Sequence, residues 1–247
     1  MASVKPVVGR RTRAIVALDV PGASDALALV GRLGAECDFV KVGSELFTAA
    51  GPGAVDAVRR RPAAEGGDRD VFLDLKLHDI PNTVRAAARR AAHLGVRLLT
   101  VHATGGRAML EAAVEGAGPD CGVLAVTVLT SLDAAALGEA WGRDAPDVQQ
   151  EVSRLAELAR AAGARGVVCA GAEAAAVRAR HGNALEILVP GVRLSGAGKD
   201  DQKRVVTPAA AASAGATYVV VGRTVTQDSD PRGALARVRA ELLASPS

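Results

Sequence analysis

The sequence has few aromatic side chains, since Phe, Trp and Tyr together make up 2% of its 247 residues. Proteins that bind single-stranded nucleic acid stack the bases on such rings, and three Phe, one Trp and one Tyr scattered along the chain do not form that platform. The formal net charge is only +3, and the basic residues do not gather in one segment. We therefore expect a protein that does not bind nucleic acid.

Cysteine is scarce as well, and Cys37, Cys121 and Cys169 lie far apart in the sequence. An odd number of widely spaced cysteines provides neither a disulfide framework nor a metal-binding Cys-x-x-Cys pair. This pattern favours a reducing compartment, and we expect a cytoplasmic protein.

Long apolar runs are absent too. No run approaches the roughly 18 residues that indicate a membrane helix, so we expect no membrane association. The basic segment 1–13 is followed by an apolar stretch that stops at Asp19, which is too short for the core of a signal peptide. We expect residues 1–13 to be an N-terminal tail and residues 14–247 to form a single domain.

The main positive signal is an alternation of short apolar runs with alanine-rich segments of helical composition. Eight such repeats over about 230 residues predict an α/β fold, a (β/α)₈ TIM barrel, because strands buried on both faces are continuous in Val, Ile and Leu. A doubly wound open sheet is the alternative, but it typically carries Gly-x-Gly-x-x-Gly after its first strand. Here that strand ends in Asp-Val-Pro-Gly. The expected strands are 14–20, 39–43, 71–76, 98–103, 123–129, 166–170, 186–190 and 218–222.

Helices are expected between these strands. Ser24 or Asp25 is predicted to cap the first, Pro81 to start the third, and the Gly-Pro-Gly at 51–53 to interrupt the helix over 44–60. The later helices are expected at 109–117, 148–162, 173–180, 208–214 and 233–243.

The segment from Leu73 to Thr83 (LDLKLHDIPNT) is the strongest candidate for a catalytic site. Alternation along a strand points Asp74 and Lys76 the same way, and Asp79 follows just beyond the strand end. We expect Lys76 to lie between the two carboxylates, which would keep it an ammonium. A charged lysine does not form a Schiff base but serves as a proton donor or stabilises negative charge. The alternative is an internal salt bridge with no catalytic role.

Two more charged residues occupy strand ends, where barrels place their functional groups. Asp19 closes the first strand and Lys41 lies on the second. Each alone could be a structural polar group, but with the aspartates they give an alternation of Lys and Asp at one mouth. His102 at the fourth strand end is either an acid–base group or a hydrogen-bonded structural histidine.

A second cluster follows the seventh and eighth strands, whose loops often bind phosphate in barrels. Gly191 and Arg193 follow the seventh strand, and Gly222 and Arg223 follow the eighth. Glycine allows close backbone approach, and arginine binds oxyanions with two hydrogen bonds. The polar loop 194–203, which contains Gln202, has the composition of a mobile lid. A solvated loop with two surface arginines is the alternative.

Taken in order, these segments resemble the orotidine 5'-phosphate decarboxylase family. The resemblance runs from about Ala14 to Leu242. It rests on IVALDV, VKVGSELF, LDLKLHDIPNTV, VHATGG, VTVLTS, PGVR, DDQKR and VVVGRTVTQ.

The resemblance implies conversion of orotidine 5'-phosphate to UMP and CO₂, the last step of pyrimidine nucleotide synthesis, with no metal and no organic cofactor. It implies a homodimer in which Asp79 and Thr83 enter the partner's site. The implied roles are proton donation to C6 by Lys76, proximity of Asp74 to the departing carboxylate, ribose contacts by Asp19 and Lys41, a pyrimidine contact by Thr130, and phosphate and lid contacts by Arg193, Gln202, Gly222 and Arg223.

Two other functions stay open at this point. A related barrel enzyme that acts on sugar phosphates with Mg²⁺ would need several oxygen ligands around the ion. A noncatalytic phosphate-binding barrel would bind UMP and leave orotidine 5'-phosphate unchanged.

Overall fold

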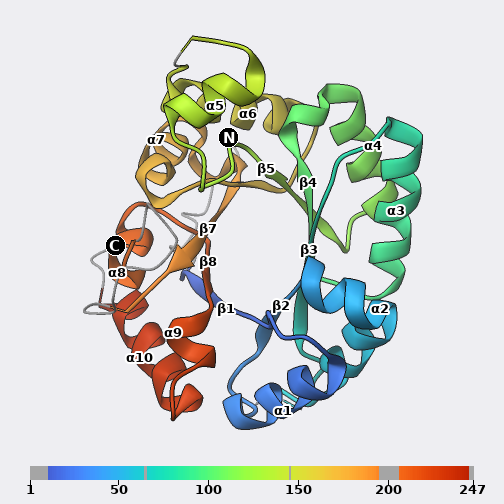
Figure 1. Ribbon diagram of the computed structural model, residues 1–247, viewed down its shortest axis with the longest axis vertical. Coiled ribbons are helices and arrows are strands. Elements are labelled where there is room, and N and C mark those ends of the chain that lie inside the picture. Colours follow the sequence, from blue (N-terminus) through green and yellow to red (C-terminus); the bar gives the residue numbers. More distant parts are fainter. Residues whose placement is uncertain (1–10, 64–65, 145, 195–205, 245–247) are drawn as a thin grey trace, which may run out of the picture.

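The structure is a computed structural model. It describes residues 11–63, 66–144, 146–194 and 206–244. Eight parallel strands pair in chain order, and β8 pairs with β1, so that the sheet closes into a barrel. Figure 1 looks down this barrel, with the strands inside and the helices around them. The predicted (β/α)₈ barrel is confirmed.

Strands and helices alternate along the described chain, with two successive helices after β5 and after β8. The strands are β1 (Arg13–Ala17), β2 (Phe39–Gly43), β3 (Asp70–Leu77), β4 (Leu98–His102), β5 (Gly122–Val126), β6 (Gly166–Val168), β7 (Glu186–Val192) and β8 (Tyr218–Val221). The helices are α1 (Ala23–Leu33), α2 (Ser44–Arg59), α3 (Pro81–His93), α4 (Arg107–Ala117), α5 (Ala134–Trp141), α6 (Val148–Ala161), α7 (Gly171–His181), α8 (Pro208–Ser213), α9 (Arg223–Thr226) and α10 (Pro231–Leu243), with short 3₁₀ turns η1 (Ala103–Gly105) and η2 (Gly182–Ala184).

Several local predictions can be compared with these bounds. Helix α3 begins at Pro81 as expected. Helix α2 is kinked at Gly51, which has a φ of 61° and is followed by Pro52. The predicted cap of α1 is wrong, because Gly22 occupies that position and Asp25 lies in the first turn. The carboxylate there still favours the helix start through the helix dipole. Helices α5 and α9 were not predicted.

The core has two layers. Outside the barrel, Val and Leu side chains of the strands pack against the alanine-rich helix faces. Inside the barrel, a second cluster contains Ile15, Phe39, Phe72, Leu98, Leu124 and Tyr218, among others. No described helix has the length and the apolar composition needed to cross a bilayer.

Alternation along the strands turns this inner layer into a polar one at the carboxyl ends. Two residues beyond buried Phe39, Phe72 and Leu98 come Lys41, Asp74 and Thr100. Since side chains two apart in a strand face the same side, these polar groups point into the upper barrel. The parallel register places Gly43 opposite Asp74 and Ala17 opposite Lys41.

Candidate active site

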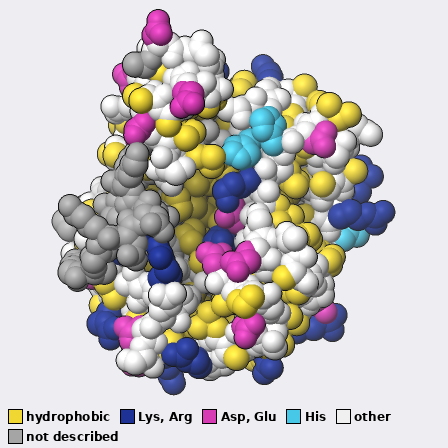
Figure 2. All heavy atoms as spheres, in the orientation of Figure 1, with side chains coloured by type: hydrophobic (Ala, Val, Ile, Leu, Met, Phe, Trp, Pro, Cys, Tyr) yellow, Lys and Arg dark blue, Asp and Glu magenta, His cyan; other side chains and the backbone are white. Residues whose placement is uncertain are grey.

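A cavity of about 320 Å³ opens at the carboxyl ends of the strands, which is the mouth where barrel enzymes hold their active sites. Figure 2 looks into this mouth and shows Lys, Arg, Asp and Glu side chains gathered around an apolar hollow. The volume is that of a site for a small ligand. The cavity is lined by Ala17, Asp19, Lys41, Phe72, Asp74, Lys76, Val126, Val128, Leu129, Thr130, Val168, Leu188, Pro190, Gly191, Val192, Arg193, Val220, Gly222, Arg223 and Thr224.

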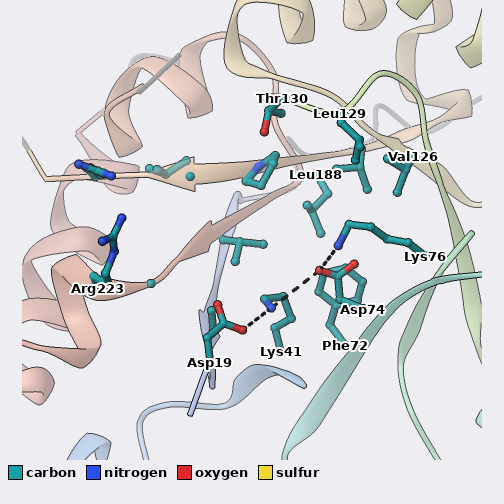
Figure 3. A pocket seen from close by; sticks show the side chains of 18 of the residues that line it. Asp19, Lys41, Phe72, Asp74, Lys76, Val126, Leu129, Thr130, Leu188 and Arg223 are labelled. Carbon is teal, nitrogen blue, oxygen red and sulfur yellow. Dashed lines mark hydrogen bonds and ion pairs between the residues drawn. The ribbon is translucent and has the colours of Figure 1, made fainter. Parts of the chain in front are cut away.

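Four charged side chains form a continuous network on one wall of the cavity. Lys41 Nζ donates a hydrogen bond to Asp19 Oδ1 at 2.8 Å and lies 3.8 Å from Asp74 Oδ2. Lys76 Nζ donates to the same Asp74 Oδ2 at 2.8 Å (Figure 3). The side chains of Lys41 and Asp74 are only 10% and 13% exposed. The two ammonium groups therefore flank the largely enclosed carboxylate of Asp74, and the partial exclusion of water strengthens its attraction to them.

The backbone at Lys76 is unusual. Its φ is 49°, and Lys76 is the one non-glycine residue with a positive φ in the part of the chain that the structure describes. The pairing of β3 with β4 also shifts register between Leu73 and Leu77. Strained backbone of this kind persists where the surrounding structure enforces it, and it gathers at functional sites.

Thr100 is a site residue that the sequence analysis missed. It is fully buried, and its hydroxyl donates to Asp74 Oδ1 at 2.8 Å and accepts from the backbone N–H of Lys76 at 3.0 Å. A polar residue two positions after Leu98 in an apolar strand was a usable signal, because buried polar groups need partners.

Asp79 and Thr83 lie outside this cavity and are exposed. Asp79 Oδ1 accepts a hydrogen bond from the backbone N–H of Ile80 at 2.6 Å. The expectation that Lys76 lies between Asp74 and Asp79 is wrong within one chain, since among the described residues its ammonium pairs with Asp74 alone. The strand ends at Leu77 and α3 begins at Pro81, so Asp79 lies in the turn between them, beyond the regular alternation of the strand.

The far end of the same cavity carries the predicted anion-binding residues. Arg193, Gly222 and Arg223 all line it, and Figure 3 shows Arg223 well apart from Lys76, across the pocket. Gly191 and Thr224 also line this end, and Gly191 has a φ of 69° that favours glycine. Gln202 and residues 195–203 of the predicted lid lie outside the described residues.

An apolar wall faces the charged network and was not predicted. Its members Val126, Val128 and Leu129 come from the end of β5 and the segment after it, where the predicted strand 123–129 stops early at Val126. Val168 and Leu188 continue this wall, and the predicted pyrimidine contact Thr130 lies at its edge (Figure 3). A flat apolar ligand portion would fit between this wall and the lysines.

The remaining candidate groups are less suited to catalysis. The His102 ring lies 5.5 Å from the His78 ring, and burial, with the nearby His78 and Lys76, lowers the pKa of His102. His102 does not line the cavity.

The three cysteines are buried. Burial raises the pKa of Cys37 to about 11, so that its thiol stays protonated and unreactive. Within the described segments, no three His, Cys, Asp or Glu side chains are placed to hold a metal ion.

Comparison with known proteins gives consistent similarities. Residues 12–238 match the family model described as Orotidine 5'-phosphate decarboxylase / HUMPS family. A relative from Anaeromyxobacter sp. (strain K), named orotidine 5'-phosphate decarboxylase, is 54% identical over 230 residues, covering 93% of this chain and 98% of the relative. A relative of the same name from Halorhodospira halophila (strain DSM 244 / SL1) is 49% identical over 236 residues, covering 94% and 97%.

The solved structures show the same relationship. The crystal structure of orotidine 5'-phosphate decarboxylase from Lactobacillus acidophilus superposes with a TM-score of 0.80 at 34% identity, covering 95% of this chain and all of that one. The family model spans most of the chain and the relatives are matched over nearly their full length. The chain therefore belongs to the Orotidine 5'-phosphate decarboxylase / HUMPS family.

Proposed function

We propose that this protein decarboxylates orotidine 5'-phosphate to UMP and CO₂, the final step of pyrimidine nucleotide synthesis. Family membership supports the reaction. The observation that carries the proposal is one cavity with a Lys41–Asp74–Lys76 network at one end and two arginines at the other. This layout suits a substrate with a reacting ring at one end and a phosphate at the other.

Lys76 is proposed as the proton donor. When the C6–carboxylate bond breaks, its electron pair stays on C6, and no adjacent group on the pyrimidine delocalises it. A fixed ammonium beside C6 stabilises this charge and then transfers its proton to C6. The 2.8 Å contact with Asp74 supports this role, because the carboxylate holds the Lys76 side chain at the reacting end of the cavity.

Each remaining residue is proposed to bind one part of the substrate. Asp74 lies near the departing carboxylate, Asp19 and Lys41 contact the ribose, and Thr130 contacts the pyrimidine. Lys41 also belongs to the charged network. The phosphate is bound by Arg193, Gln202, Gly222 and Arg223, with the loop 194–203 closing over it.

The reaction is proposed to need no metal and no organic cofactor. Asp74 is the carboxylate best placed to hold a cation at the reacting end, and Lys41 and Lys76 already occupy the space on both sides of it. The ammonium groups therefore supply the positive charge that Mg²⁺ would otherwise bring.

The active unit is proposed to be a cytoplasmic homodimer in which Asp79 and Thr83 complete the partner's site. Their exposure and their position just outside the mouth support this arrangement. Ile80 beside them is 67% exposed, and an exposed large apolar side chain is suited to an interface. Residues 14–247 are proposed to be the catalytic barrel domain, together with Arg13, which was expected in the tail 1–13 but begins β1.

The test is the ultraviolet absorbance of orotidine 5'-phosphate mixed with the purified protein after treatment with EDTA. We expect the absorbance to change from that of the substrate to that of UMP. Turnover that appears only after Mg²⁺ is added would favour the metal-dependent alternative. Binding of UMP without any turnover would favour the noncatalytic barrel and contradict the proposal.

A further inference from the structure

The pairing between β3 and β4 is uneven beside the charged network. Leu73 pairs with Leu99, and Leu77 pairs with Val101. Between these two pairs β3 has three residues, 74 to 76, whereas β4 has only Thr100. The strand that carries the acid and the amine is therefore bulged, and a single threonine faces the bulge.

The Thr100 hydroxyl makes hydrogen bonds to two residues of this bulge, Asp74 and Lys76. Its one proton goes to Asp74 Oδ1 at 2.8 Å, and it accepts the backbone N–H of Lys76 at 3.0 Å. Thr100 is fully buried, so that no bulk water can replace these bonds. Without the hydroxyl, the partly buried N–H of Lys76 and the partly buried carboxylate oxygen of Asp74 would each lose a partner.

These two bonds fix the geometry of the reacting end. Because Oδ1 is held by Thr100, Oδ2 is the oxygen left for both Lys76 and Lys41. The bond to the Lys76 N–H holds the residue whose φ is 49°. The same hydroxyl therefore controls the direction of the carboxylate and the backbone from which the ammonium projects.

We propose that Thr100 is a positioning residue, whose hydroxyl orients Asp74 and the strained backbone of Lys76 so that the ammonium faces C6 of the substrate. This inference rests on the proposed decarboxylation. Thr100 does not line the cavity, and it acts through Asp74 and Lys76 rather than on the substrate.

Thr217 provides a matched control at the opposite end of the barrel. It is also a buried threonine, and its hydroxyl accepts the backbone N–H of Ile187 and a hydrogen bond from Arg178, both at 3.1 Å. Thr217→Val therefore removes a similar pair of bonds, one from the backbone and one to a charged group, far from the cavity.

The experiment measures kcat and KM for orotidine 5'-phosphate with wild type, Thr100→Val, Thr100→Ser and Thr217→Val. For Thr100→Val we expect kcat to fall about 10- to 100-fold, the range for losing a hydrogen bond to a charged group. We expect KM to change less than about threefold, because the loss affects the reacting end rather than binding. Thr100→Ser keeps the oxygen and should recover most of kcat, and Thr217→Val should have a normal kcat even if its melting temperature falls.

A normal kcat in folded Thr100→Val, or a kcat for Thr100→Ser as low as that for Thr100→Val, would overturn the proposal. If Thr100→Val does not fold, Thr100→Ala is measured instead and judged by the same criteria, because alanine adds no methyl group beside the carboxylate.

A crystal structure of the variant without the hydroxyl gives a readout independent of activity. We expect the distance between Lys76 Nζ and Asp74 Oδ2 to lengthen beyond 4 Å. An unchanged contact would contradict the proposal. Wild type that fails to turn over the substrate would instead reject the proposed function.

Discussion

The two ends of the barrel both carry ion-pair networks, but they differ in how the charges are enclosed. At the amino ends of the strands, the base, Arg13 binds Asp38 and Asp70 at 2.9 Å each, and its guanidinium lies 4.8 Å from the centre of the Phe39 ring. Arg239 of α10 binds Asp38 from the other side at 2.6 Å. The charges at the base are therefore satisfied by one another and by an aromatic face.

At the mouth, the network of Asp19, Lys41, Asp74 and Lys76 lines a cavity instead. Lys76 remains 37% exposed, and its backbone is strained and bulged. The strands at the base pair in regular register. A set of paired charges therefore does not by itself mark an active site. A cavity beside the charges and a backbone forced out of its ordinary conformation distinguish the mouth from the base.

The largest expected effect concerns completion of the mouth by a second subunit. Lys76→Ala and Asp79→Ala should each be nearly inactive as pure proteins. After subunit exchange in an equal mixture, half of the dimers are mixed, and each mixed dimer has one wild-type site, so that about a quarter of the wild-type activity should return. No recovery despite demonstrated exchange would show that Asp79 does not act across an interface.

The next prediction tests the far end of the cavity. Arg223→Ala should lower kcat/KM for orotidine 5'-phosphate about 10- to 100-fold, because each charged contact contributes ~1.5–3 kcal/mol, and should scarcely affect orotidine, which lacks the phosphate. Arg232→Ala, an exposed arginine paired with Glu36, serves as the control and should change neither value. Equal losses for both substrates would mean that Arg223 does not contact the phosphate.

A smaller effect on kcat/KM is expected for a substitution at Gly43, whose lack of a side chain leaves space for the Lys41 ammonium. A Cβ at Gly43 would lie 2.7 Å from Lys41 Nζ and 3.1 Å from Asp19 Oδ1, so Gly43→Ala should displace the ammonium and lower kcat/KM about tenfold. Gly31→Ala on α1 meets no atom within 4 Å and should leave the kinetics unchanged. If Gly43→Ala is as active as Gly31→Ala, the position of Lys41 is not critical.

The last prediction concerns the base, where charge should matter for stability alone. Glu186 Oε2 contacts Arg165 Nε and the Tyr218 hydroxyl at 3.0 Å each. Glu186→Gln should lower the free energy of unfolding by ~1–3 kcal/mol, while kcat per folded molecule stays unchanged. Glu111→Gln, which breaks an exposed pair with Arg107, should cost less than about 0.5 kcal/mol. A fall in kcat for Glu186→Gln would contradict the prediction that the charges at the base affect stability and not catalysis.

Much of the fold was predictable because its signals are local. The apolar run of β2 gave the bounds Phe39–Gly43 correctly, and alternation correctly placed Asp74 and Lys76 together. Thr100 and the apolar wall depend on which residues of neighbouring strands face each other. A bulge changes that register without any marker in the sequence of either strand.

Asp79 shows the other limit of sequence reasoning. Its distance of three residues from Lys76 suggested contact, but the strand ends at Leu77 and α3 begins at Pro81, and this turn directs the carboxylate outward. Spacing along a chain predicts contact only while the regular period continues. Within one chain Asp79 is exposed and lies outside the cavity, so its proposed role depends on a second subunit, which the sequence of one chain does not place.

The role of the mouth network is tested most directly by the kcat of Lys76→Ala for orotidine 5'-phosphate, with the fold verified by circular dichroism and thermal unfolding. We expect a folded protein whose kcat is lower by at least about 1,000-fold, because the mutation removes the charge proposed to stabilise the carbanion and the proton proposed to go to C6. Lys76→Arg should fail as well, since guanidinium is larger and a poor proton donor. A folded Lys76→Ala protein with a kcat close to that of wild type would contradict the assignment of the mouth network as the catalytic centre.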